Sequence, residues 1–272
     1  MQTSNTIDGQ SGAARALVVA ARAGYFAKGF LYAGIGVLAG LAAFGRAGGQ
    51  TTGIKGTLQE LTTHSFGSTL LGLAAAGLAG HVLWRFYQAI ADPARKGTDP
   101  KGLLLRSGFA VSGLAYASAA LFAFRILLGQ AAGSSDETSS QTATLMSRPG
   151  GVWLVALVGI GFIGVGLYQF YRAYRASFED KWLPMPNDLQ CWATRLSRLG
   201  IATRAIVFLM SGGFLVLAAW RSDPGAARGI GGALAELAAQ PHGRYLLGAA
   251  AAGLICYGVY CALNGRYRRI QP

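Results

Sequence analysis

The stretch Arg22-Ala23-Gly24 begins a pattern that this chain repeats twice more. The pattern returns 84 positions later as Arg106-Ser107-Gly108, and 176 positions after its first occurrence as Arg198-Leu199-Gly200. A fixed period over units of this size indicates tandem copies of one supersecondary unit. We therefore expect three equivalent repeats at residues 22–91, 106–175 and 198–267. The same two offsets relate Tyr32 to Tyr116 and Phe208, Gly77 to Gly161 and Gly253, and Trp84 to Tyr168 and Tyr260.

The composition of the chain indicates a membrane protein. Hydrophobic residues make up 52% of the sequence and charged residues only 13%, whereas soluble domains usually carry about 25% charged residues. Each repeat contains two long apolar runs, and about 20 residues of helix cross a hydrocarbon core of roughly 30 Å. We predict an all-α protein with six transmembrane helices in a single membrane domain covering residues 1–272. The helices are expected near 22–44, 66–89, 106–128, 150–173, 198–220 and 242–264.

The net charge of +13 is distributed unevenly between the two sides that six spans define. Of the 24 Lys and Arg residues, 17 fall on the side of the two termini, including Arg95 and Lys96 in the linker 92–105. The positive-inside rule then places both termini, and the linkers 92–105 and 176–194, in the cytoplasm. A basic band beside a membrane also attracts anionic lipid headgroups. The charge therefore indicates contact with the lipid bilayer and not with nucleic acid.

Two spans in each repeat mean that successive repeats start from the same side of the membrane. They are therefore parallel repeats, and we expect them to surround a pseudo-threefold axis along the membrane normal. Between the two spans of repeats 1 and 3, residues 56–61 and 232–237 have leucines at the spacing of a short, one-sided helix. We expect short helices in the outer interface there. In repeat 2, the corresponding segment follows a Gly- and Ser-rich run, 133–140, that we expect to be flexible.

Residues with small side chains recur every four positions in several of the apolar runs. Ridges of this kind let transmembrane helices approach closely, because lipid provides no hydrophobic drive for helix association. We expect the ridges to hold the first helix of each repeat against its second. They are formed by Gly36 and Gly40, by Gly72, Ala76 and Gly80, and by Gly248 and Ala252.

Four recurring features together resemble a bacterial membrane-protein family that is catalogued as a domain of unknown function. They are the Arg-x-Gly start, the Gly-x-x-Leu-Leu segments at 67–71 and 243–247, Gly77-Leu78, and Trp84-Arg85. The family carries three tandem two-helix copies, and the resemblance covers residues 22–265. It implies six spans in the bacterial inner (plasma) membrane, and it brings no assigned activity. Repeat 2 departs most, because Arg148-Pro149-Gly150-Gly151-Val152-Trp153 stands where a Gly-x-x-Leu-Leu segment is expected.

Lys28 and Arg204 occupy equivalent positions inside the first helix of repeats 1 and 3, where repeat 2 has Ser112. Charged groups inside membrane spans are costly and often functional. Two interpretations are open at this point. So near the end of a span, both side chains can extend to the lipid headgroups; alternatively, both line an inward-facing cavity. Tyr32 and Phe208 lie one helical turn further on, where they are placed to stack against the cations.

The second helix of each repeat ends in aromatic and polar residues. An aromatic belt at the membrane interface accounts for most of them, but the polar ones are also placed to ring a cytoplasmic vestibule on the pseudo-axis. Their positive charge would favour an anionic ligand, such as a lipid headgroup or a small carboxylate or phosphate compound. We expect the strongest polar cavity to open to the cytoplasm among the candidate ligand-binding residues, which are Lys28, Arg85, Gln88, Gln169, Arg172, Arg204 and Asn264.

Catalytic and cofactor signals are weak. His81 is the only histidine well inside a span, and without a second intramembrane histidine a hydrogen-bonded structural role is favoured over haem ligation. The three cysteines, Cys191, Cys256 and Cys261, lack a metal-binding spacing. The sequence contains no nucleophile with an adjacent base, no HExxH and no phosphate-binding glycine loop. We therefore predict no catalytic residue, no metal and no cofactor, and leave the roles of Glu60 and Glu236 open.

Two functions remain open from the sequence. The first is a pathway or binding site for a small anionic solute or lipid. The alternative is a membrane scaffold or accessory protein without transport activity. A site requires polar side chains that face the interior of the bundle, whereas a scaffold requires small or aromatic patches that face outward. The two functions can be distinguished by whether four side chains point into the bundle or outward, namely those of Lys28, Arg204, Arg85 and Gln88.

Overall fold

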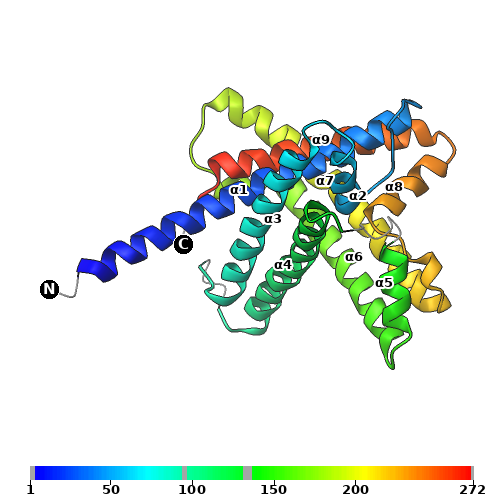
Figure 1. Cartoon of the computed structure of the whole chain (residues 1–272), viewed down its shortest axis with the longest axis horizontal. Coiled ribbons are helices and arrows are strands. Elements are labelled where there is room, and N and C mark those ends of the chain that lie inside the picture. The colour runs from blue at the N-terminus through cyan, green and yellow to red at the C-terminus, as the bar shows by residue number, and fades with distance from the viewer. Residues whose placement is uncertain (1–3, 94–96, 131–136, 271–272) are drawn as a thin grey trace.

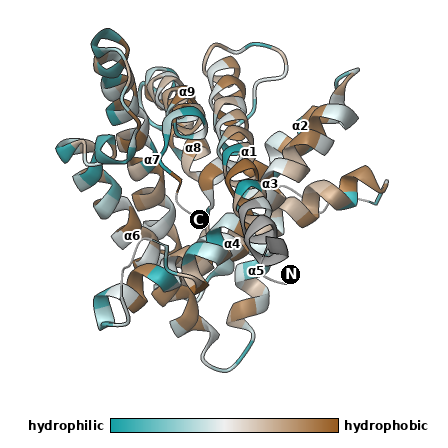
Figure 2. Ribbon diagram, turned by 90° about the vertical axis from the view of Figure 1, so that its left-hand side faces the viewer, coloured by the Kyte–Doolittle hydropathy of each residue, from teal (hydrophilic) through white to brown (hydrophobic). Residues whose placement is uncertain are grey.

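The computed structural model describes residues 4–93, 97–130 and 137–270, and the regular elements of these ranges are helices. Six of the helices are long and apolar enough to cross a membrane, as the sequence predicts. Hydrophobic residues run along them, and hydrophilic residues concentrate toward their ends and in the loops (Figure 2). They are α1 (Ser4–Ala43), α3 (Gly67–Ile90), α4 (Pro100–Leu127), α6 (Gly151–Arg175), α7 (Asn187–Arg221) and α9 (Gly243–Tyr267) (Figure 1).

The first helix of each repeat begins earlier than the sequence predicts. The α4 helix starts at Pro100, and α7 starts directly after Pro186. Proline is favoured at the first helical position, which Pro100 occupies, because its fixed φ suits a helix and its missing N–H would have no partner there. The α1 helix starts at Ser4, and its 40 residues would measure about 60 Å. Its N-terminal part consequently projects beyond the other helices (Figure 1).

Short helices join the two spans of every repeat, on the side of the bundle opposite the termini. They are α2 (Ile54–Leu61), α5 (Glu137–Met146) and α8 (Ile230–Ala239). Leu58, Thr142 and Leu234 occupy equivalent positions in them, and all three are buried. This confirms the short helices of repeats 1 and 3 and adds one in repeat 2. The predicted flexible run 133–140 is wrong for residues 137–140, which are helical; residues 133–136, like Arg95 and Lys96, lie outside the described ranges.

The six spans pack side by side in a ring that is open between α4 and α6. The second helix of each repeat packs along the first helix of the next: α3 on α4, α6 on α7, and α9 back on α1. This order of contacts is that of the expected pseudo-threefold arrangement. Within repeats 1 and 3 the two spans also pack together, α1 on α3 and α7 on α9. In repeat 2, α4 and α6 do not pack along each other, and they diverge toward the bottom of Figure 1.

Glycines also form close helix crossings between neighbouring repeats. A Cβ atom at Gly36 of α1 would lie 2.7 Å from the Ala251 carbonyl oxygen of α9. At the equivalent crossing of α7 and α6, a Cβ atom at Gly212 would lie 2.7 Å from the Gly159 carbonyl oxygen. Both glycines are therefore required for the backbones to touch. The Gly36 ridge holds α1 against repeat 3 and not, as the sequence suggested, against its own second helix.

The linker before α7 packs against the end of α9. It contains the 3-10 turn η1 (Glu179–Lys181), and a second such turn, η2 (Pro224–Ala226), precedes α8. Phe178 and Trp182 of the linker are buried, and the ring of Phe178 meets that of Tyr260 edge-on, with centroids 5.6 Å apart. A backbone bridge joins Trp182 to Arg268. This packing covers the terminus-side end of the bundle next to α9.

Candidate functional site

Two cations from equivalent positions meet in the interior of the bundle. Lys28 of α1 is 5% exposed, and its Nζ lies 5.9, 5.3 and 5.4 Å from the ring centroids of Tyr32, Tyr116 and Tyr257. These rings belong to α1, α4 and α9. A cation above an aromatic face is stabilised by the ring quadrupole. Lys28 is therefore enclosed by three helices and does not extend to the headgroup region.

Arg204 of α7 is held by hydrogen bonds as well as by rings. Its Nε donates to Tyr32 Oη at 3.0 Å, and its Nη1 donates to Gln169 Oε1 of α6 at 2.5 Å. The guanidinium lies 4.1 Å from the ring centroid of Phe208, 5.3 Å from that of Tyr32 and 5.0 Å from that of Tyr257. Lys28 and Arg204 thus share the rings of Tyr32 and Tyr257.

This cluster of cations contains no carboxylate. Within the described ranges, neither Lys28 nor Arg204 forms an ion pair, and Lys28 Nζ has no hydrogen bond. Among the described residues, Asp188 is the only Asp or Glu within the six membrane-crossing stretches, the first of which begins at Gly12. Asp188 is in the first turn of α7, about 24 Å along the helix from Arg204 at 1.5 Å per residue. A buried charge is costly unless it is paired, and no carboxylate of the described residues pairs with these two cations.

Two further buried polar side chains beside the cations lack hydrogen-bond partners within the described residues. His81 of α3 is fully buried between the ring edges of Tyr25 and Tyr116, and neither of its ring nitrogens has a partner. The hydrogen bond that a structural histidine was expected to make is therefore not formed. Gln169 is also buried, and its Nε2 has no partner although its Oε1 accepts from Arg204.

The other candidate residues form two smaller groups. Arg85 Nη1 donates to Gln88 Oε1 at 3.1 Å, and its guanidinium lies over the ring of Phe109. Arg172 Nη2 donates to Tyr260 Oη at 3.0 Å, and Asn264 Nδ2 donates to the carbonyl oxygen of Tyr260 at 2.7 Å. The structure thus joins Lys28, Arg204 and Gln169 into one centre. Of the remaining four residues, Arg85 and Gln88 pair on α3, whereas Arg172 and Asn264 each bond to Tyr260 of α9.

The rings of Tyr32 and Phe208 lie against the cations, as the sequence predicts, but sequence reasoning missed two further aromatic side chains of this centre. They are Tyr116, which the sequence marks only as a repeat position, and Tyr257, which is among the aromatic residues at the end of the last helix; both are buried against Lys28. The repeat period contained the signal, because Tyr257 is equivalent to the buried His81 and Tyr116 is equivalent to Tyr32.

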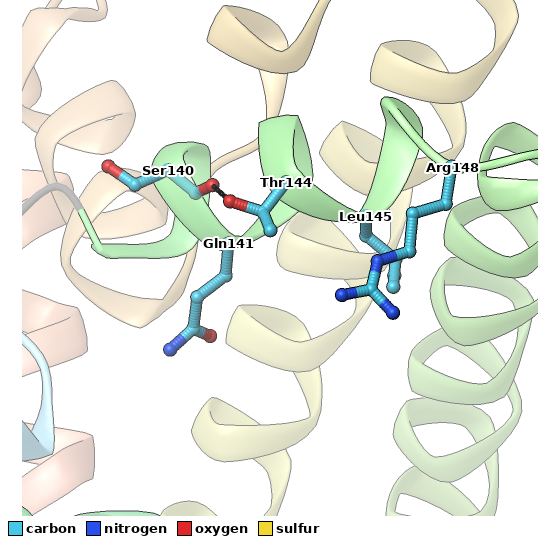
Figure 3. Close-up of a pocket in the computed structure, with 5 residues that line it drawn as sticks. All are labelled: Ser140, Gln141, Thr144, Leu145 and Arg148. Atoms are coloured by element: carbon cyan, nitrogen blue, oxygen red, sulfur yellow. Dashed lines mark hydrogen bonds between the residues drawn. The ribbon is translucent and has the colours of Figure 1, made fainter.

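Two surface hollows lie beside the short helices that join the spans, one next to α5 and one next to α2. One, of about 300 Å³, is lined by residues on or just after α5 (Figure 3). The other adjoins α2. Neither hollow is lined by a candidate ligand-binding residue, so the expectation that these residues line a polar cavity open to the cytoplasm stays a prediction. The linings are Ser140, Gln141, Thr144, Leu145 and Arg148 for the first, and Gln50, Thr52, Gly56, Gln59, Glu60, Thr62 and Thr63 for the second.

Comparison with known proteins places the chain in a family. A family model described as Domain of Unknown Function (DUF1206) matches three times in tandem, at residues 23–92, 107–176 and 199–268. The chain is 38% identical over 251 residues to the uncharacterized protein YxxB of Bacillus subtilis (strain 168), which covers 92% of this chain and 90% of the relative. No solved structure matches. The three matches, which span most of the six-helix ring, show that this chain belongs to the DUF1206 family.

Proposed function

We propose that this membrane protein binds an anionic group, a carboxylate or a phosphate, beside Lys28 and Arg204. The observation that carries the proposal is the shared placement of the two cations over the rings of Tyr32 and Tyr257. No carboxylate of the described chain pairs with either. An anion would supply the missing counter-charge in surroundings where charge-assisted hydrogen bonds are strong.

Three sets of donors are available to such an anion. Lys28 Nζ carries three N–H groups and makes no hydrogen bond to the described residues. Arg204 uses Nε and Nη1 for Tyr32 and Gln169, which leaves the N–H groups of Nη2. The Nε2 amide of Gln169 is buried without a partner. These donors are of the kind that phosphate and carboxylate oxygens accept.

The distribution of Lys and Arg between the two sides of the membrane supports a location for the protein. We infer that it resides in the bacterial plasma membrane with both termini in the cytoplasm. The support is the excess of Lys and Arg on the side of the termini, together with a relative from Bacillus subtilis.

Anion-dependent thermal stability tests the binding proposal. The full chain in a neutral detergent is heated with inorganic phosphate, hexanoate or short-chain phosphatidylglycerol, with hexanol as the uncharged control. A ligand at ten times its Kd stabilises the folded protein by about 1.4 kcal/mol, so at least one anion is expected to raise the Tm and hexanol is not. The double variant Lys28→Met/Arg204→Met is expected to lose the response.

The matched control is Lys101→Met/Arg266→Met, which removes the same two charges from exposed positions and is expected to keep the response. If none of the three anions raises the Tm, or if the double variant responds like the unaltered protein, the binding proposal fails. The scaffold function then becomes the better account of the molecule.

A further inference from the structure

Repeat 2 carries the glycines of a close helix crossing but does not form the crossing. In repeat 1, Cβ atoms at Gly24, Gly77 and Gly80 would each lie within 2.5–2.7 Å of an atom of the other span. Their equivalents in repeat 2 are Gly108 on α4 and Gly161 and Gly164 on α6. A Cβ atom at any of these three would have nothing within 4 Å.

The residues beside these glycines are also uncovered. Val111 of α4 is 65% exposed, although its equivalents Ala27 and Thr203 are each 8% exposed. Val165 of α6 is 47% exposed, whereas its equivalents His81 and Tyr257 are 0% and 4% exposed. We call these five positions, Gly108, Val111, Gly161, Gly164 and Val165, the α4–α6 opening. All of its side chains are apolar, so a hydrocarbon can cover it without burying polar groups.

The α4–α6 opening adjoins the two cations. On α6, Gln169 follows Val165 by one helical turn and accepts the hydrogen bond of Arg204. On α4, Tyr116 follows Val111 by five residues, and its ring contacts Lys28 Nζ. Each helix that borders the opening therefore also contacts one member of the cation pair. The opening thus has an apolar wall and, beside it, an uncompensated positive charge.

We infer that the α4–α6 opening seats an anionic lipid. The acyl chain lies between α4 and α6 against the five apolar positions, and the phosphate or carboxylate of the headgroup reaches Lys28 and Arg204. This inference rests on the proposed anion site and adds the class of ligand and its route of access. A lipid matches both features of the site, because it carries an anion and a hydrocarbon chain in one molecule. It also arrives from within the bilayer, so no free anion has to cross the apolar face of the protein.

Photolabelling by lipids tests this inference. The full chain is placed in nanodiscs that contain phosphatidylglycerol or phosphatidylcholine with a diazirine in the acyl chain, and labelled residues are mapped by mass spectrometry. At residues 108–111 and 161–165, phosphatidylglycerol is expected to label several-fold more than phosphatidylcholine. The ratio is expected to fall to one in Lys28→Met/Arg204→Met.

A variant that blocks the α4–α6 opening provides a second test by photolabelling. Val165→Trp fills the α4–α6 opening and is expected to reduce the phosphatidylglycerol label on α4 several-fold. Leu83→Trp, at a 60% exposed position on α3, places the same side chain elsewhere and is expected to leave the label unchanged. Equal labelling by both lipids would overturn the inference, as would a cross-link between copies through Val111→Cys, which would show that a second copy fills the opening.

The two proposals fail in distinguishable ways. If phosphate or hexanoate raises the Tm of the unaltered protein but phosphatidylglycerol does not label the opening preferentially, the anion site stands and the lipid inference is wrong. If no anion of any kind raises the Tm and labelling is equal, both are wrong.

Discussion

Lys28 and Arg204 occupy equivalent positions in repeats 1 and 3, and both stand over the ring of Tyr257, at 5.4 and 5.0 Å from its centroid. The repeat period places them at the same depth, and the ring-like packing of the spans turns both inward. Their environments differ in one respect: Arg204 has hydrogen-bond acceptors, whereas Lys28 has only aromatic faces within the described residues.

This difference leads to a prediction for Lys28→Met. Methionine keeps most of the volume and removes a buried charge with which no carboxylate of the described ranges pairs, so the ligand-free protein should become more stable. Even replacing a whole buried ion pair by apolar groups of similar volume is often neutral or stabilising, by about 1–4 kcal/mol, and a charge without a carboxylate has no such attraction to lose. A rise in Tm without added anion is expected, and Lys101→Met should leave the Tm unchanged. A lower Tm for Lys28→Met would show that the charge is already compensated.

Gln169→Leu should have the opposite effect. It removes the acceptor of Arg204 Nη1 and leaves a buried guanidinium N–H without a partner, which costs about 1–3 kcal/mol. A lower Tm is expected in neutral detergent. Gln59→Leu, at an exposed position of α2, is the control and should change the Tm little. If the two variants behave alike, the hydrogen bond contributes nothing to stability.

The crossing of α1 and α9 can be tested with glycine substitutions of the same kind at two sites. Gly36→Ala places a Cβ atom 2.7 Å from the Ala251 carbonyl oxygen, whereas Gly72→Ala meets nothing within 4 Å. Overpacking a close contact costs about 1–3 kcal/mol, so Gly36→Ala should lower the Tm and Gly72→Ala should not. Equal Tm values would show that the two helices separate without cost.

The linker before α7 should contribute to stability through Trp182. This side chain is 5% exposed, whereas Trp192 on the same terminus side is 65% exposed. Truncating a buried Trp to Ala costs about 3–5 kcal/mol, so Trp182→Ala should lower the thermal unfolding temperature strongly and Trp192→Ala only slightly. A small effect at Trp182 would mean that the linker is not docked on α9.

The orientation of the chain can be tested by cysteine labelling in intact cells. In a background without the three native cysteines, Gly97→Cys and Asn187→Cys should resist a reagent that cannot cross the membrane, because both lie on the basic side. Ser135→Cys should be labelled, because the sequence predicts the opposite side for this residue, which lies outside the described ranges. Reaction at Gly97→Cys would reverse the inferred topology.

The sequence by itself determined the repeats and the six spans, because both follow from local properties. Periodicity at 84 and 176 positions needs no contact information, and the length of each apolar run matches a bilayer. Residues such as Lys28 and Arg204 could also be singled out, since a cation in an apolar run is unusual wherever the helix lies. Helix starts were less certain, because the linker residues before α4 and α7 continue the helices.

Tertiary structure alone decided which helices meet and what surrounds each charge. The equivalent glycines Gly24 and Gly108 are indistinguishable in sequence, yet the first touches another span and the second touches nothing. Packing of α1 against α9 and of α3 against α4 turns Lys28 inward and surrounds it with rings from three helices. The same packing places it away from every carboxylate of the described residues. Such contacts join residues far apart in the chain, and local patterns do not specify them because several packings of the same apolar faces bury similar areas.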